Sequence, residues 1–145
     1  MQDRVVMNIC DICHKDPLAH SFKKVAEKRG IAMFYCKPSQ AKRYNDTAGI
    51  LAHVDKAILA HNGKWICVID GDHFEAKHLV EYETGLGLME LFFTKHFSTL
   101  VEIKVINPNI YVRNAMKILI AMIVEEKASK ITVLDDKPYS ILQFI

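Results

Sequence analysis

The sequence of 145 residues lacks a strong excess of charge of either sign: 19 basic and 17 acidic side chains leave a formal net charge of +2. No basic run and no basic–aromatic interleaving occurs, so we expect no nucleic-acid partner. A signal-peptide pattern and a lipidation motif are also missing, so we expect a cytoplasmic protein. In that compartment its four cysteines would be reduced thiols rather than disulfides.

The motifs of several enzyme classes are missing as well. No Gly-x-Ser-x-Gly elbow is present, so acyl transfer has no support. No glycine-rich loop follows a strand, so a phosphate cradle of that kind is excluded. These two classes of enzyme are therefore not expected, and our prediction, which the family resemblance below implies, is a protein that is not an enzyme, with no catalytic residue and no cofactor.

The most informative segment is a β-α-β pattern, with an apolar strand over 101–106, a helix over 109–127 and a short strand over 130–134. Residues 118–124 are apolar on every side of the helix, whereas a helix on one face of a sheet needs only an apolar stripe. The helix is too short to span a bilayer, which takes about 20 residues. Burying a large apolar side chain is worth roughly 1.5–3 kcal/mol. The second face therefore meets more protein, a partner, a membrane surface or an apolar ligand.

The rest of the chain alternates strands and helices, which predicts the α/β class with a small, mainly parallel sheet and flanking helices. We expect a single domain over 1–145, made of an N-terminal helical segment (1–29) and an α/β core (30–145). Its other predicted elements are a helix from 16 to 29 that ends at Gly30, strands over 31–36 and 65–69, helices over 41–61, 75–82 and 86–97, and a final helix from 138.

An ordered set of features then resembles the CRAL-TRIO lipid-binding family. A strand ends in Asp70-Gly71, a helix closes in Lys95-His96-Phe97, the apolar strand 101–106 leads into Asn107-Pro108, and 130–134 reads Lys-Ile-Thr-Val-Leu. The resemblance covers roughly residues 30–145. It implies that the helix 109–127 is a mobile gate over an apolar pocket floored by the sheet, and that the pocket binds a lipid or other lipophilic molecule without covalent chemistry.

This resemblance gives a set of candidate ligand-binding residues from the gate, the strands and the helix before the β-α-β unit. The lipophilic ligand is the expected partner, and the gate also allows transient contact with a membrane. Methionine suits an adaptable wall of this kind. The candidates are Met33, Cys67, Ile69, Phe92, Ile103, Val105, Met116, Leu119, Ile120 and Ile123.

Two other functions stay open. Residues 100–112 also resemble the BCH branch of the same fold, which implies a protein-interaction or homodimerisation module; the usual histidine before proline is Asn107 here. In addition, Asp70 and Asp72 after a strand, with Asp135-Asp136 after another, are similar to the haloacid-dehalogenase-like phosphatases. In those enzymes Mg²⁺ neutralises clustered carboxylates during phosphoryl transfer.

The sequence Cys10-Asp11-Ile12-Cys13-His14 matches the c-type haem attachment pattern. Zinc is an alternative, with Cys10, Cys13 and either His14 or His20 as ligands and Cys36 as the fourth. The interpretation that we favour is a pair of partly buried thiols without a metal. We also expect His53 and His61, on the helix 41–61, to face solvent.

Overall fold

The computed structural model describes residues 10–79 and 82–145. A sheet with strand order β1-β2-β3-β4-β5 forms its centre. β1 pairs antiparallel with β2 and the other pairings are parallel, which confirms the predicted α/β class with a mainly parallel sheet. The elements are β1 (Lys23–Lys28), β2 (Ile31–Cys36), β3 (Trp65–Asp70), β4 (Leu100–Ile106), β5 (Ile131–Leu134), α1 (Asp11–Lys15), α2 (Thr47–His61), α3 (Ala76–Leu79), α4 (Tyr82–Glu90), α5 (Ile110–Met122) and α6 (Glu125–Ala128).

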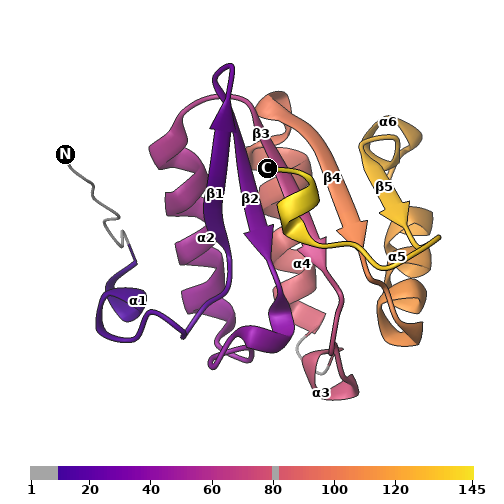
Figure 1. The fold of residues 1–145 in the computed structure, drawn as a ribbon, viewed down its shortest axis with the longest axis horizontal. Helices are drawn as coiled ribbons and strands as arrows, with labels where there is room; N and C mark the ends of the chain where they lie inside the picture. Colours follow the sequence, from indigo (N-terminus) through magenta and orange to yellow (C-terminus); the bar gives the residue numbers. More distant parts are fainter. Residues whose placement is uncertain (1–9, 80–81) are drawn as a thin grey trace.

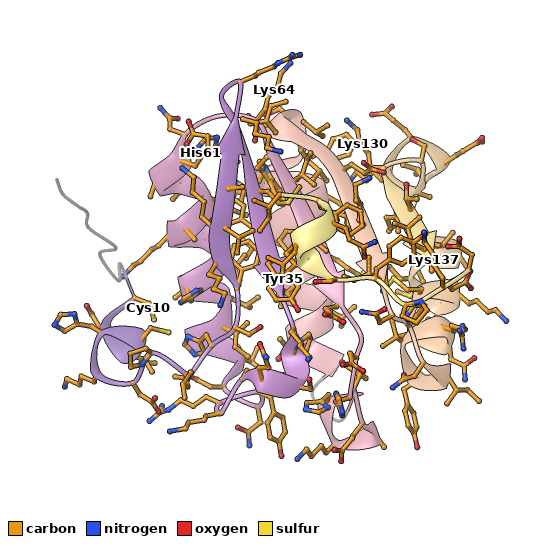
Figure 2. The ribbon with its side chains drawn as sticks, in the orientation of Figure 1. Cys10, Tyr35, His61, Lys64, Lys130 and Lys137 are labelled. Atoms are coloured by element: carbon orange, nitrogen blue, oxygen red, sulfur yellow. The ribbon has the colours of Figure 1, made fainter. Side chains whose placement is uncertain are left out.

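The longer helices that connect the parallel strands, α2, α4 and α5, lie on one face of the sheet (Figure 1). This follows from the strand order, because right-handed connections between successive neighbouring strands place every crossover helix on the same side. The C-terminal segment covers part of the opposite face, where Tyr139, Ile141 and Phe144 pack with Tyr35 and Val68. Tyr35 lies beneath this segment in Figure 2.

The predicted helix from 16 to 29 is wrong, because Lys23–Lys28 is the edge strand β1; residues 1–9 of the expected helical segment lie outside the described part. Arg29 and Gly30 form the tight turn to β2 with φ of +54° and +79°, as in the turns that suit two-residue hairpins. Because β1 is rich in lysine, its composition favoured a helix in the sequence analysis. On an edge strand, lysines oppose pairing with a further chain.

The helix predicted over 41–61 begins later, at Thr47. Its cap is Asp46, whose side chain accepts a hydrogen bond from the Gly49 amide at 3.2 Å, as an aspartate at that position commonly does. The helix then runs unbroken to His61, and Asn62 ends it in the left-handed conformation with φ of +54°. The prediction is therefore confirmed from Thr47 to His61.

The helix predicted over 86–97 starts earlier, as α4, and continues through a π-helical turn, Leu91–Lys95. Two residues at the end of this turn hold it to α2. Lys95 Nζ lies 2.9 Å from one oxygen of the Asp55 carboxylate, and His96 Nε2 lies 2.7 Å from the other. Burial opposes ionisation of Asp55, but these two hydrogen bonds outweigh it, so that the pKa of Asp55 is lowered.

The predicted helix 109–127 is divided into α5 and α6. Asn109 caps α5 by accepting hydrogen bonds from the amides of Tyr111 and Val112. At its other end, Ile123 and Val124 have extended backbones. Helix α6 then begins with Glu125 and Glu126, whose negative charge is favourable at a helix N-terminus.

The last predicted helix, from 138, is limited to a single 3₁₀ turn over Ile141–Gln143. Ser140 and Gln143 close its start as a reciprocal capping box. No helix in the described ranges has both the length and the apolar content needed to cross a bilayer.

Candidate functional site

The floor of the candidate site is the sheet face that carries the helices. Because neighbouring strands present paired residues to the same face, the register builds a row from Cys67 through its partner Ile103 to Ile131. A second row pairs Cys36 with Ile69. All five side chains line one cavity of about 680 Å³. This volume lies within the range of about 300–1,000 Å³ that is usual for small-molecule sites.

The walls of the cavity come from the helices. The π-helical turn after α4 supplies Phe92 and Phe93, which are 6% and 3% exposed. Helix α5 supplies Met116, Leu119 and Met122. The remaining lining comes from α2, α3 and α4 and from the segments before β1, after β2 and after β3, and it is also dominated by apolar side chains.

Helix α5 packs loosely on the rest of the molecule. Val112 is its one buried residue, whereas Ile118 is 63% and Met122 is 61% exposed although both border the cavity. The start of α5 is held more tightly, against Gly71. A Cβ atom at Gly71 would lie 2.9 Å from the Asn107 carbonyl oxygen and 3.0 Å from Val112 Cγ2. The helix is therefore fixed at its N-terminal end and free of close packing along most of its length.

The structure separates the predicted ligand-binding residues into two groups. Those that line the cavity are Cys67, Ile69, Phe92, Ile103, Met116 and Leu119. The other four do not border it: Met33 packs on the opposite face of the sheet, Val105 and Ile123 belong to the core beside the cavity, and Ile120 is exposed. The sequence reasoning missed Ile118 and Met122, which lie three and seven residues after the lining residue Ala115 and so share its face of α5.

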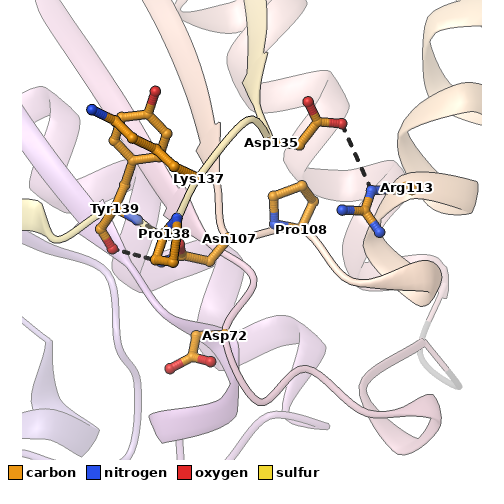
Figure 3. A pocket seen from close by; sticks show the side chains of 8 residues that line it. All are labelled: Asp72, Asn107, Pro108, Arg113, Asp135, Lys137, Pro138 and Tyr139. Atoms are coloured by element: carbon orange, nitrogen blue, oxygen red, sulfur yellow. Dashed lines mark hydrogen bonds and ion pairs between the residues drawn. The ribbon is translucent and has the colours of Figure 1, made fainter.

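A second hollow, of about 460 Å³, lies at the carboxyl ends of the parallel strands (Figure 3). Asp72, Arg113 and Asp135 border it, with an ion pair of 3.7 Å between Arg113 Nε and Asp135 Oδ2. Asp136 instead accepts a hydrogen bond from the Tyr139 hydroxyl. Among the residues described, no three carboxylates converge as a metal site. Asp72 and Asp135 thus share this hollow, and the phosphatase alternative stays a prediction.

Asp70, one of the aspartates of the phosphatase alternative, is 6% exposed and accepts three hydrogen bonds. The donors are the Tyr35 hydroxyl at 2.6 Å, Asn107 Nδ2 at 3.0 Å and the Asp72 amide at 3.0 Å. Burial, and then the Asp70 carboxylate itself, raise the pKa of Tyr35, which keeps that phenol protonated as a donor. Asp70 therefore joins the ends of β2, β3 and β4.

The predicted cysteine pair belongs to a larger cluster with two histidines. The nearest ligand atoms of Cys10, Cys13, His20 and His53 all lie within 4.8 Å of one another. His14 is exposed and does not belong to this cluster, and Cys36 lies in the cavity wall instead. The expectation that His53 faces solvent is wrong: it is partly buried, and burial lowers its pKa. His61 is also turned inward, with its ring towards the carbonyls of Gly30 and Lys64.

Comparison with models of known protein families gives no match to this chain. A search among curated proteins likewise gives no significant match.

Proposed function

We propose that the chain is a cytosolic, non-catalytic, CRAL-TRIO-like module that holds one lipophilic molecule between the sheet and α5. The observation that carries this proposal is the apolar cavity of about 680 Å³ beneath a helix with a single buried residue. Protein interiors are normally packed as densely as organic crystals. A large apolar space beside exposed apolar side chains such as Ile118 is therefore costly to leave without an occupant.

The lining also supports a ligand class. The described part of the lining contains no lysine, arginine or carboxylate, so a charged head group would find no ionic partner inside. Burying an unpaired charge is strongly unfavourable. The proposed occupant is therefore an uncharged lipophile, or a lipid whose acyl chain enters while its head group stays at the opening beside α5.

The chemistry of the cavity supports binding rather than catalysis. Burial raises the pKa of Cys36 to about 11 and that of Cys67 well above its ordinary value. The nucleophilic form of cysteine is the thiolate, so both side chains act as small apolar groups at neutral pH. Asp70 faces away from the cavity lining and is occupied by its three donors.

The test is extraction of pyrene-labelled phosphatidylcholine from vesicles of unlabelled phosphatidylcholine. Transfer of single lipids to the protein lowers pyrene excimer emission. It should also quench Trp65, the one tryptophan, whose ring lies 5.3 Å from that of the cavity residue Phe92. Native mass spectrometry then gives the number of lipids per chain, which we expect to be one. Undiminished excimer emission with the unmodified protein would contradict the proposal.

Two alanines of α5 offer a matched pair of variants. Ala115 lines the cavity, whereas Ala121 is exposed and does not. Ala115→Phe fills part of the space and should weaken lipid binding by at least about tenfold, or ~1.4 kcal/mol. Ala121→Phe adds the same ring outside and should leave binding unchanged. Equal effects of the two substitutions would place the lipid elsewhere.

A second candidate is the BCH-like interaction module, which the outer side of α5 favours. Ile120 on α5 is 39% exposed, Val124 in the extended link to α6 is 63% exposed, and neither lines the cavity; exposed apolar side chains of this kind are typical of contact surfaces. Sedimentation of the unmodified chain and of Ile120→Glu, with Ala121→Glu as the control, tests a homodimer. A monomer at every concentration would exclude it.

A further inference from the structure

We propose that Cys10, Cys13, His20 and His53 form a structural zinc site that attaches the N-terminal segment to α2. Two cysteines and two histidines are a common tetrahedral donor set for Zn²⁺. The distances fit this geometry. With Zn–S bonds of about 2.3 Å and Zn–N bonds of about 2.0–2.1 Å, sulfur and nitrogen ligands lie about 3.6 Å apart. The Nδ1 atom of His20 lies 3.6 Å from Cys10 Sγ and 3.4 Å from Cys13 Sγ, and that of His53 lies 3.5 Å from Cys13 Sγ.

The hydrogen bonds of the two imidazoles direct their lone pairs into the cluster. His53 Nε2 contacts the Phe22 carbonyl oxygen, which only accepts, so this nitrogen carries the proton and Nδ1 is left as a donor to metal. His20 Nε2 lies 3.4 Å from Asp46 Oδ2. A ligating histidine whose other nitrogen is bonded to a carboxylate or a carbonyl is the usual outer-shell arrangement of zinc sites. Here both histidines have it.

Charge balance also favours a divalent cation. The cysteine and histidine side chains of the cluster are mostly buried; Cys13 is 2% and His20 6% exposed. Binding of Zn²⁺ by two thiols and two neutral imidazoles releases two protons to solvent and leaves a centre with no net charge. The nearby Asp46 carboxylate is in turn paired with Arg43 at 3.9 Å. No unpaired charge is thereby buried.

The N-terminal segment has little else to hold it. Apart from the two cysteines, its small core contains Ala19, with Ile12 against it. The other described attachments of residues 10–20 include backbone hydrogen bonds from Lys42 and Arg43 to the carbonyls of Leu18 and Ala19, and an exposed ion pair of 3.6 Å between Lys42 and Asp16. Elements too small to form an apolar core commonly depend on a metal or a disulfide. The four protein ligands would complete the coordination sphere, which is typical of structural rather than catalytic zinc.

The test uses the full chain purified without chelator and then incubated with Zn²⁺ or Co²⁺. We expect native mass spectrometry to show one zinc per chain with loss of two protons, and Co²⁺ to give the absorption bands of a tetrahedral, thiolate-bound ion. An octahedral Co²⁺ spectrum, a Cys10–Cys13 disulfide under reducing purification, or no bound metal would each overturn the proposal. These readouts need no variant and do not involve lipid.

Two histidines supply the matched comparison. His14 directly follows Cys13 but is exposed, whereas His20 belongs to the cluster. His20→Ala should lower the affinity for Zn²⁺ by more than the roughly 100-fold at the upper end of outer-shell effects, and His14→Ala should leave it unchanged. An equal loss in both variants would assign the metal to a different set of ligands. If the protein takes up no zinc but still binds lipid, the zinc site is refuted and the proposed lipid-binding function is not.

Discussion

Asn107 offers the sharpest test of how the carboxyl ends of the strands are held together. It lies in the left-handed region, with φ of +50°. Its Nδ2 donates to Asp70 Oδ1 at 3.0 Å and to the Tyr139 carbonyl at 2.8 Å, and its Oδ1 accepts from the Tyr139 amide at 2.8 Å. One side chain thus joins β3 to the C-terminal segment that covers the free face of the sheet.

The expected cost of Asn107→Ala follows from these contacts. Two neutral hydrogen bonds contribute about 1 kcal/mol each, and the bond to a carboxylate about 2 kcal/mol. Holding alanine in the left-handed conformation adds about 1 kcal/mol. Because Asn107 is only partly buried, water replaces some of the lost bonds, and we expect a total loss near 3 kcal/mol. Asn107→Gly should recover the conformational part, about 1 kcal/mol.

Asn62 is the matched control, because it has φ of +54° but an exposed side chain at the end of α2. Asn62→Ala should cost only the conformational part, about 1 kcal/mol. Urea denaturation with unchanged m-values gives the free energies of unfolding for all three variants. If Asn107→Ala costs no more than Asn62→Ala, the network around Asp70 does not stabilise the fold and the reasoning fails.

Three further predictions concern other contacts. Gly71→Ala should destabilise the protein by about 1–3 kcal/mol through crowding of Val112, measured by thermal unfolding; an unchanged midpoint would contradict the close approach. Asp55 has a lowered pKa in the folded protein. Its contribution to the free energy of unfolding is therefore complete above about pH 5 and is lost as pH falls through the folded-state pKa. In Asp55→Asn the free energy of unfolding, measured by urea denaturation, should therefore fall less on acidification than in the unmodified protein. An equal fall in both proteins would refute this. Asp46→Asn should keep the cap of α2 but weaken zinc binding about 10–100-fold through His20, and unchanged zinc affinity would exclude that outer-shell role.

Local patterns in the sequence were sufficient to predict the parallel part of the sheet. The strands at 31–36 and 65–69 are short apolar runs, the strand at 101–106 alternates apolar residues with Glu102 and Lys104, and the helices between these strands are long enough for crossover connections. β1 could not be found in the same way. Its lysines and Glu27 favour a helix locally, and pairing with β2 through the turn at Gly30 outweighs that preference.

The inward face of each strand was harder to predict than the strand itself. A continuously apolar strand such as β3 is buried on both sides, so its sequence does not show which side faces the helices. Met33 was assigned to the cavity for this reason, and it lies on the other face. The cysteine–histidine cluster shows a different limit, because His53 is 40 residues from Cys13 in the chain. Only the packing of α2 against the N-terminal segment brings them together.

The cavity and the cysteine–histidine cluster share two side chains, because His20 and His53 border both. A metal would fix each of these imidazoles by two bonds, one to the ion and one to an oxygen acceptor. The wall that His20 and His53 form could then not move to admit a ligand. The opposite wall, α5, has one buried residue and no comparable restraint beyond its N-terminal cap. Proteins open locally in cooperative units, and the units with few buried apolar contacts open most easily. Entry of a lipophile is therefore expected at α5, and the substitution at Ala115 tests the movable wall rather than the fixed one.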